Sequence, residues 1–102
     1  MTIAKCARAF IEGRSKACHN SSTDGKLYLL HGHRIAERHA HGITFYWCDW
    51  YTVTTANHIN HILIAMDAKF RVSYATDRDL GINTFEALLG ERTLPSNDPK
   101  VT

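Results

Sequence analysis

The stretch TFYWCDWYTVTTANHINHI, residues 44–62, changes its apolar period partway along. Up to Trp47 the large side chains alternate, with Ile43, Phe45 and Trp47 on one face, as in a half-buried strand. Beyond Trp50 the apolar residues recur with helical spacing, and Thr54 or Thr52 can cap a helix over residues 55–66. The stretch therefore predicts a strand followed by an amphipathic helix that packs on the sheet.

The segments before this stretch predict one helix and two more strands. Residues 3–12 repeat apolar side chains with helical spacing. Residues 13–25 show no period, and the polar run over residues 20–25 is expected to form a loop. Residues 26–31, 33–38 and 42–48 are short strand candidates with brief connections. Such connections favour antiparallel neighbours, so we expect a three-stranded meander.

The segments after the second helix predict one or two further strands. Residues 69–75 alternate cleanly and indicate a strand, and residues 76–81 indicate a turn. Residues 82–89 fit a strand or a helical turn, and we favour the strand. The expected fold is α+β: a short N-terminal helix, the meander, a second helix packed on the sheet, and the further strands. We expect one compact domain over residues 1–92 and a flexible tail over residues 93–102.

Composition excludes several function classes. A net charge of +2 over 102 residues is too weak to indicate a nucleic-acid binder by itself. The three cysteines form no close pair, which does not resemble a disulfide framework. The sequence shows neither a signal peptide nor an apolar run long enough to cross a bilayer. We therefore expect a protein of the cytosol, without a membrane partner.

Histidine is unusually frequent, with seven in the chain. His31 and His33, like His39 and His41, have the spacing of residues that share one face of a strand. Turns are expected at both pairs, however, and no two cysteines have finger-like spacing, so we expect no metal and no other cofactor. No nucleophile elbow or phosphate-binding glycine loop is present, so no catalytic residue is assigned.

The aromatic and polar residues around residue 50 predict a binding surface. Trp50 and Tyr51 follow the end of the strand, so they can cover the small core, offer an exposed ring, or do both. The helix start favours anions, and Asn57 and His58 lie off the expected apolar stripe, where they should matter little for stability. The predicted surface comprises Trp50, Tyr51, Thr54, Asn57 and His58, with Arg34 and Arg38 nearby on the meander.

Residues 26–63, KLYLLHGHRIAERHAHGITFYWCDWYTVTTANHINHIL, carry a recognisable pattern. The pieces are Phe10 with Gly13, Leu30-His31-Gly32 with Ile35-Ala36, and Trp50 with Thr52, Thr54, Thr55 and Asn60. Together they resemble small uncharacterised accessory proteins of tailed bacteriophages, over about residues 10–85. Asp49 departs from the pattern, which usually has Gly before the Trp, and this puts the tightness of the turn in question.

The resemblance implies a function in the infected host. Small phage accessory proteins often bind and block host machinery, including defence systems such as CRISPR. We therefore expect an inhibitor that acts by stoichiometric binding to a host protein complex. A nucleotide or nucleic-acid binding protein, such as a sponge for signalling nucleotides, is the first alternative. A small enzyme based on histidine or a metal is the second. The sequence does not specify an oligomeric state.

Overall fold

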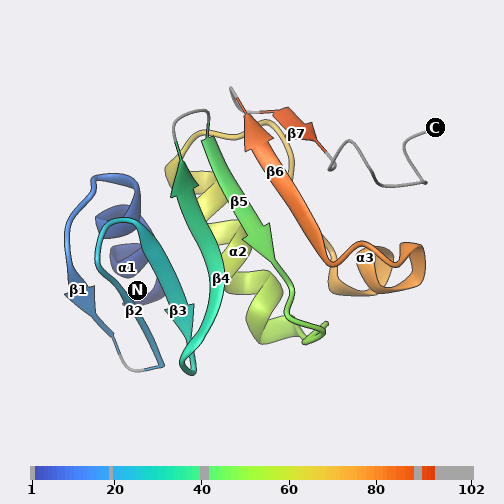
Figure 1. The fold of residues 1–102 in the computed structure, drawn as a ribbon, viewed down its shortest axis with the longest axis horizontal. Coiled ribbons are helices and arrows are strands. Elements are labelled where there is room, and N and C mark those ends of the chain that lie inside the picture. The colour runs from blue at the N-terminus through green and yellow to red at the C-terminus, as the bar shows by residue number, and fades with distance from the viewer. Residues whose placement is uncertain (1, 19, 40–41, 89–90, 94–102) are drawn as a thin grey trace.

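One antiparallel sheet runs through the computed structural model, which describes residues 2–18, 20–39, 42–88 and 91–93 (Figure 1). In the described residues its seven strands lie in chain order, so each inner strand pairs with the strand before it and the strand after it. They are β1 (Lys16–Ala17), β2 (Ser21–Thr23), β3 (Leu27–Leu30), β4 (His33–His39), β5 (Gly42–Tyr46), β6 (Thr84–Leu88) and β7 (Glu91–Thr93). The predicted meander corresponds to β3, β4 and β5 and is confirmed.

Two helices cover one face of this sheet, and no described segment covers the other, which we call the uncovered face (Figure 1). They are α1 (Thr2–Ile11) and α2 (Val53–Ala65), which pack against each other. A third helix, α3 (Tyr74–Leu80), lies to the side, close to the start of β6. The α+β class and the second helix on the sheet are as the sequence predicts. No helix in the described ranges has both the length and the apolar character needed to cross a bilayer.

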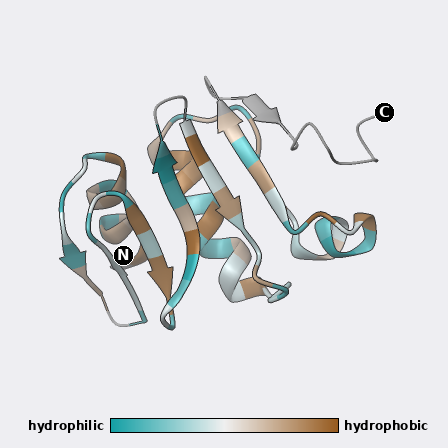
Figure 2. Ribbon diagram, in the orientation of Figure 1, coloured by the Kyte–Doolittle hydropathy of each residue, from teal (hydrophilic) through white to brown (hydrophobic). Residues whose placement is uncertain are grey.

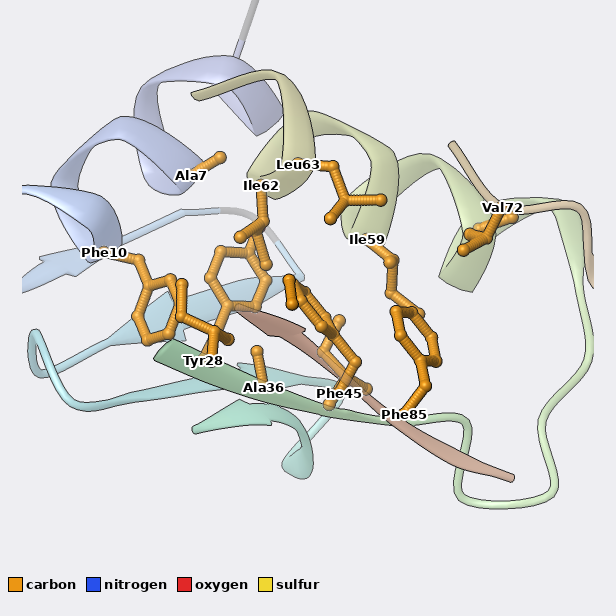
Figure 3. Close-up of a cluster of buried hydrophobic side chains, with 14 of the residues drawn as sticks. Ala7, Phe10, Tyr28, Ala36, Phe45, Ile59, Ile62, Leu63, Val72 and Phe85 are labelled. Atoms are coloured by element: carbon orange, nitrogen blue, oxygen red, sulfur yellow. The ribbon is translucent and has the colours of Figure 1, made fainter. Parts of the chain in front are cut away.

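The core lies between the two helices and the sheet (Figure 3). Phe45, Trp47, Ile59 and Leu63 are fully buried, so the alternation in β5 and the stripe on α2 meet as expected. Along β5 apolar residues alternate with weakly polar ones, and β4 ends in a hydrophilic run (Figure 2). The interior joins α1 to the sheet through the edge-to-face contact of Phe10 with Tyr28, whose ring centroids are 5.8 Å apart.

A bulge interrupts β4 and changes which residues face the helices. The register with β3 shifts between Tyr28 and Leu29, and both Ile35 and Ala36 are buried. An extra residue in one strand moves the following side chains to the opposite face. Arg34 and Arg38, which simple alternation would place on the same face, therefore lie on opposite faces of the sheet.

The prediction of a loop over residues 20–25 is wrong, because β2 lies within it, and β1 lies among the residues without a period before it. Ser21 and Thr23 of β2 are buried, and the Tyr28 hydroxyl lies 3.3 Å from Ser21 Oγ. Hydroxyl side chains replace the apolar residues of an ordinary strand here, so the segment shows no hydrophobic period.

The prediction of a strand over residues 69–75 and a turn over residues 76–81 is also wrong. The chain is irregular before Tyr74, where α3 begins, and Gly81 ends α3 in the left-handed conformation with a φ of 69°. A side chain holds the backbone at Val72: Asn60 Oδ1 accepts from the Val72 N–H at 2.8 Å, and Asn60 Nδ2 donates to the Val72 carbonyl at 3.0 Å. These two bonds satisfy the backbone N–H and C=O of Val72 as pairing with a neighbouring strand would. They connect Val72 to α2 and not to the sheet.

The remaining boundaries agree closely with the prediction. The strand reading of residues 82–89 is confirmed by β6, which pairs with β5. Thr52, one of the two predicted caps, caps the N-terminus of α2, and its Oγ1 accepts from the N–H of Thr55 at 3.2 Å. Most of the predicted tail, residues 94–102, lies outside the described residues, so the domain limits stay a prediction.

Candidate functional site

A tight turn presents Trp50 to solvent. The N–H of Trp50 donates to the carbonyl of Trp47 at 2.9 Å, and the two central residues, Cys48 and Asp49, have φ of 55° and 61°. A left-handed backbone costs a residue other than glycine roughly 1–2 kcal/mol. The turn therefore forms although Asp49 stands where the pattern has Gly, and it forms at a cost in strain. Such strain is concentrated at functional sites. The indole that follows the turn is 49% exposed.

The contacts behind the turn hold it rigidly. Asn83 Oδ1 accepts from the N–H of Asp49 at 3.1 Å, and the Tyr51 hydroxyl donates to the carbonyl of Ile82 at 2.9 Å. The ring of Tyr51 stacks on that of Trp47 at 5.3 Å. Burial is the main cause of the raised pKa of Tyr51. Tyr51 therefore anchors the turn, while Trp50 points outward.

The anchor continues into α3 through a buried polar pair. Trp47 Nε1 donates to Asp77 Oδ2 at 2.8 Å, and both side chains are inaccessible to solvent. A hydrogen bond to a carboxylate is among the stronger ones a buried indole can make. Sequence reasoning missed Asp77 because a turn was expected at that position. Asp77 is 30 residues from Trp47 in the sequence, so no local pattern indicates that the two side chains meet.

A cleft of about 200 Å³ opens beside Trp50. The β3–β4 hairpin forms one wall and the start of α2 the other, and the lining residues are Leu30, His31, Trp50, Thr52, Thr54 and Thr55. The exposed ring of His33 lies next to the indole, with centroids 5.0 Å apart. Sequence reasoning considered His31 and His33 only as metal ligands. The two-residue connection at His31-Gly32 was the available sign that the hairpin places them beside residue 50.

The start of α2 brings hydroxyls and a favourable dipole to the cleft. Thr52 Oγ1 and Thr55 Oγ1 lie 3.1 Å apart, and the exposed Thr54 lies between them in the sequence. The first turn of α2 contains no acidic residue that would neutralise the positive end of the helix dipole. The exposed Asn57 follows one turn later, so Trp50, Thr54 and Asn57 all border solvent at this end of α2.

His58 points the opposite way, so the prediction that it lies on the polar face of the helix is wrong. It is 4% exposed, and its Nδ1 lies 2.8 Å from the hydroxyl of the fully buried Tyr28. Burial, with smaller effects from His61 and His31, lowers the pKa of His58 to about 4. Burial likewise raises the pKa of Tyr28. The pair is a hydrogen-bonded part of the core, and a ligand at Trp50 would not meet the His58 imidazole directly.

The two arginines are not brought together at the cleft. Arg38 donates to the carbonyls of Phe10 and Gly25, and so closes the C-terminal end of α1. Arg34 lies on the uncovered face of the sheet, 3.1 Å from Glu37 Oε1 and with its guanidinium 4.4 Å from the centroid of the Tyr46 ring. Arg38 is therefore structural in character, and Arg34 belongs to a polar network on the uncovered face.

Two observations bear on metal and cysteine chemistry. In the described ranges, no group of three or more His, Cys, Asp and Glu side chains is arranged to hold a metal ion. None of the three cysteines, all of which the structure describes, forms a disulfide. Burial is the main cause of the raised pKa values of Cys18 and Cys48, with that of Cys18 at about 11. A raised pKa keeps a thiol protonated at neutral pH, where it is a poor nucleophile.

Comparison with protein-family models, with curated proteins and with solved structures found no match. The likeness to phage accessory proteins therefore remains a resemblance in the sequence.

Proposed function

We propose that this chain is a small phage-type accessory protein that inhibits a host process by binding a host protein in a fixed ratio. The binding surface is the Trp50 surface, which we define as Trp50, His31, His33, Val53 and Thr54. The observation that carries the proposal is the half-exposed indole of Trp50 on a turn with two strained non-glycine residues. A rigid, solvent-exposed Trp is the type of residue that most often dominates binding energy at protein interfaces.

The neighbours of Trp50 support a protein partner. Val53 is 56% exposed at the start of α2, three residues after Trp50, so a second exposed apolar side chain follows the indole closely in the chain. The imidazoles of His31 and His33 and the hydroxyl of Thr54 border it with polar groups. An apolar centre within a polar rim is the usual arrangement of a protein interface. The strained turn and its anchors keep this arrangement in place before binding, which lowers the entropy cost of association.

A nucleotide is the second candidate ligand, favoured by the cleft beside Trp50. An exposed indole can stack on a base, and the start of α2 can accept a phosphate. Among the described residues that line the cleft, however, none is Lys or Arg. Arg38 is already bonded to α1, and Arg34 is paired with Glu37 on the uncovered face. The shortage of permanent positive charge makes a protein partner the better fit.

Affinity capture from lysates of bacterial hosts tests the proposal. The tagged wild-type chain, Trp50→Ala and Leu80→Ala are compared, because Leu80 is also an exposed apolar side chain, at 47%, but lies on α3. The wild type and Leu80→Ala should retain the same protein in a fixed ratio, and Trp50→Ala should lose it. Equal retention by all three would refute the Trp50 surface. An absorbance excess near 260 nm in the purified wild type that Trp50→Ala lacks would favour the nucleotide.

A further inference from the structure

A groove lies between the solvent-facing sides of α1 and α2, apart from the Trp50 surface. Its volume is about 170 Å³, and its lining residues are Ala4, Lys5, Arg8, His61, Ile64 and Ala65. Ile64 and Ala65 belong to the last turn of α2, whereas Trp50 precedes its first turn. At a rise of about 1.5 Å per residue the two ends of this helix are roughly 18 Å apart. The groove is therefore a separate site.

The groove combines an aliphatic floor with cations at its rim. Ile64 is 54% exposed, so its aliphatic side chain is open to solvent in the groove. Lys5 and Arg8 of α1 are exposed and lie one turn apart on the same side of that helix. Such a groove can take up an aliphatic side chain while the rim attracts carboxylates.

The cations at the rim of the groove have little acidic charge near them in the sequence, and Glu12, four residues after Arg8, pairs with Arg14. Neither α1 nor α2 contains an acidic residue. Arg14, Arg34 and Arg78 each pair with a carboxylate close in sequence, whereas no ion pair in the described part of the chain includes Lys5 or Arg8. The groove therefore has an uncompensated field that complements an acidic partner.

We propose that this groove binds a protein segment that presents one aliphatic side chain flanked by Asp or Glu. A nucleic acid fits less well, because the groove offers no aromatic ring for stacking among its described lining residues and only two permanent cations. A membrane fits less well, because helices that lie on a membrane bury a broad apolar face. Among the described residues that line the groove, Ile64 is the only large exposed aliphatic one.

Fluorescence anisotropy with designed probes tests this proposal. The probe is a short fluorescein-labelled peptide with a central Leu flanked by Glu, and the matched probe has Lys in place of each Glu. The acidic peptide should bind at low salt and the basic one should not. The double variant Lys5→Glu with Arg8→Glu should weaken binding at least about tenfold, and Ile64→Asn at least about threefold. All three residues are partly or largely solvent-exposed, so folding should survive, which far-UV circular dichroism checks.

Lys16→Glu with Lys26→Glu is the matched control, because it changes the net charge equally at exposed positions at or next to the strands. Its affinity should stay within about twofold of the wild type, since these lysines do not line the groove. Equal weakening by the two double variants would overturn the proposal, as would failure of the acidic peptide to bind. Tighter binding of anionic lipid vesicles or of oligothymidylate, lost in the Lys5 and Arg8 variant, would assign the groove to a membrane or a nucleic acid instead.

Discussion

Mild acid should destabilise this protein through His58. The imidazole is 4% exposed and its Nδ1 lies 2.8 Å from the buried Tyr28 hydroxyl. Burial lowers the pKa of His58 from 6.5 to about 4 in the folded state. The unfolded chain therefore binds a proton at His58 at a higher pH than the folded chain does. The contribution of the neutral, buried His58 to the free energy of unfolding is therefore complete above about pH 6.5. It is lost as the pH falls towards 4.

The size of the effect follows from linkage. With His58 pKa values of 6.5 unfolded and about 4 folded, the free energy of unfolding should fall by about 2 kcal/mol between about pH 7.5 and pH 5. The loss should approach about 3 kcal/mol near pH 4. That is a large fraction of the roughly 5–15 kcal/mol that holds a domain folded.

Urea unfolding at a series of pH values measures this directly. The variant His58→Gln keeps a group that can hydrogen-bond Tyr28 but cannot titrate, so its stability should depend on pH less steeply, by about the same 2 kcal/mol over that range. His33→Gln, which removes an exposed imidazole, is the matched control and should keep the slope of the wild type. If the wild type and His58→Gln have the same slope, the reasoning about the buried imidazole is refuted.

Three further substitutions test the scaffold, each by denaturant unfolding. Leu63→Ala should cost about 2–4 kcal/mol, because Leu63 is fully buried and its loss leaves a cavity; a cost below about 0.5 kcal/mol would contradict the core assignment. Asp49→Gly should stabilise the fold by about 0.5–1 kcal/mol, because glycine tolerates a φ of 61°; a loss of stability would show that the carboxylate has a compensating role. Asp77→Ala should cost about 2 kcal/mol by leaving the Trp47 N–H unpaired, and a neutral result would argue against that bond.

Local pattern was sufficient where one face of an element is buried against the core. The alternation of Ile43, Phe45 and Trp47 and the stripe through Ile59 and Leu63 placed β5 and α2 correctly, since burial on one side leaves a visible period. Residues 69–75 alternate equally well and yet form no strand. Their backbone at Val72 is satisfied by the distant Asn60 amide, and no local pattern encodes that partner.

The candidate site shows the same division. The sequence predicted that Trp50 would follow the end of a strand and adjoin a helix start, and the structure places it there. The orientation of His58 could not be predicted, because its burial depends on a hydroxyl from Tyr28 on another element. Arg34 and Arg38 lie on opposite faces because the bulge in β4 moves the residues after it to the other face of the sheet. The residue types in β4 do not indicate where such a bulge occurs.

The central claim, that Trp50 serves recognition, is tested most directly by isothermal titration of the captured partner with Trp50→Ala. The indole is half-exposed, so its removal should cost roughly 1 kcal/mol of stability or less. Binding should weaken at least tenfold, about 1.4 kcal/mol, while Leu80→Ala binds like the wild type. If Trp50→Ala binds its partner within about threefold of the wild type, the Trp50 surface is not where this protein recognises its target.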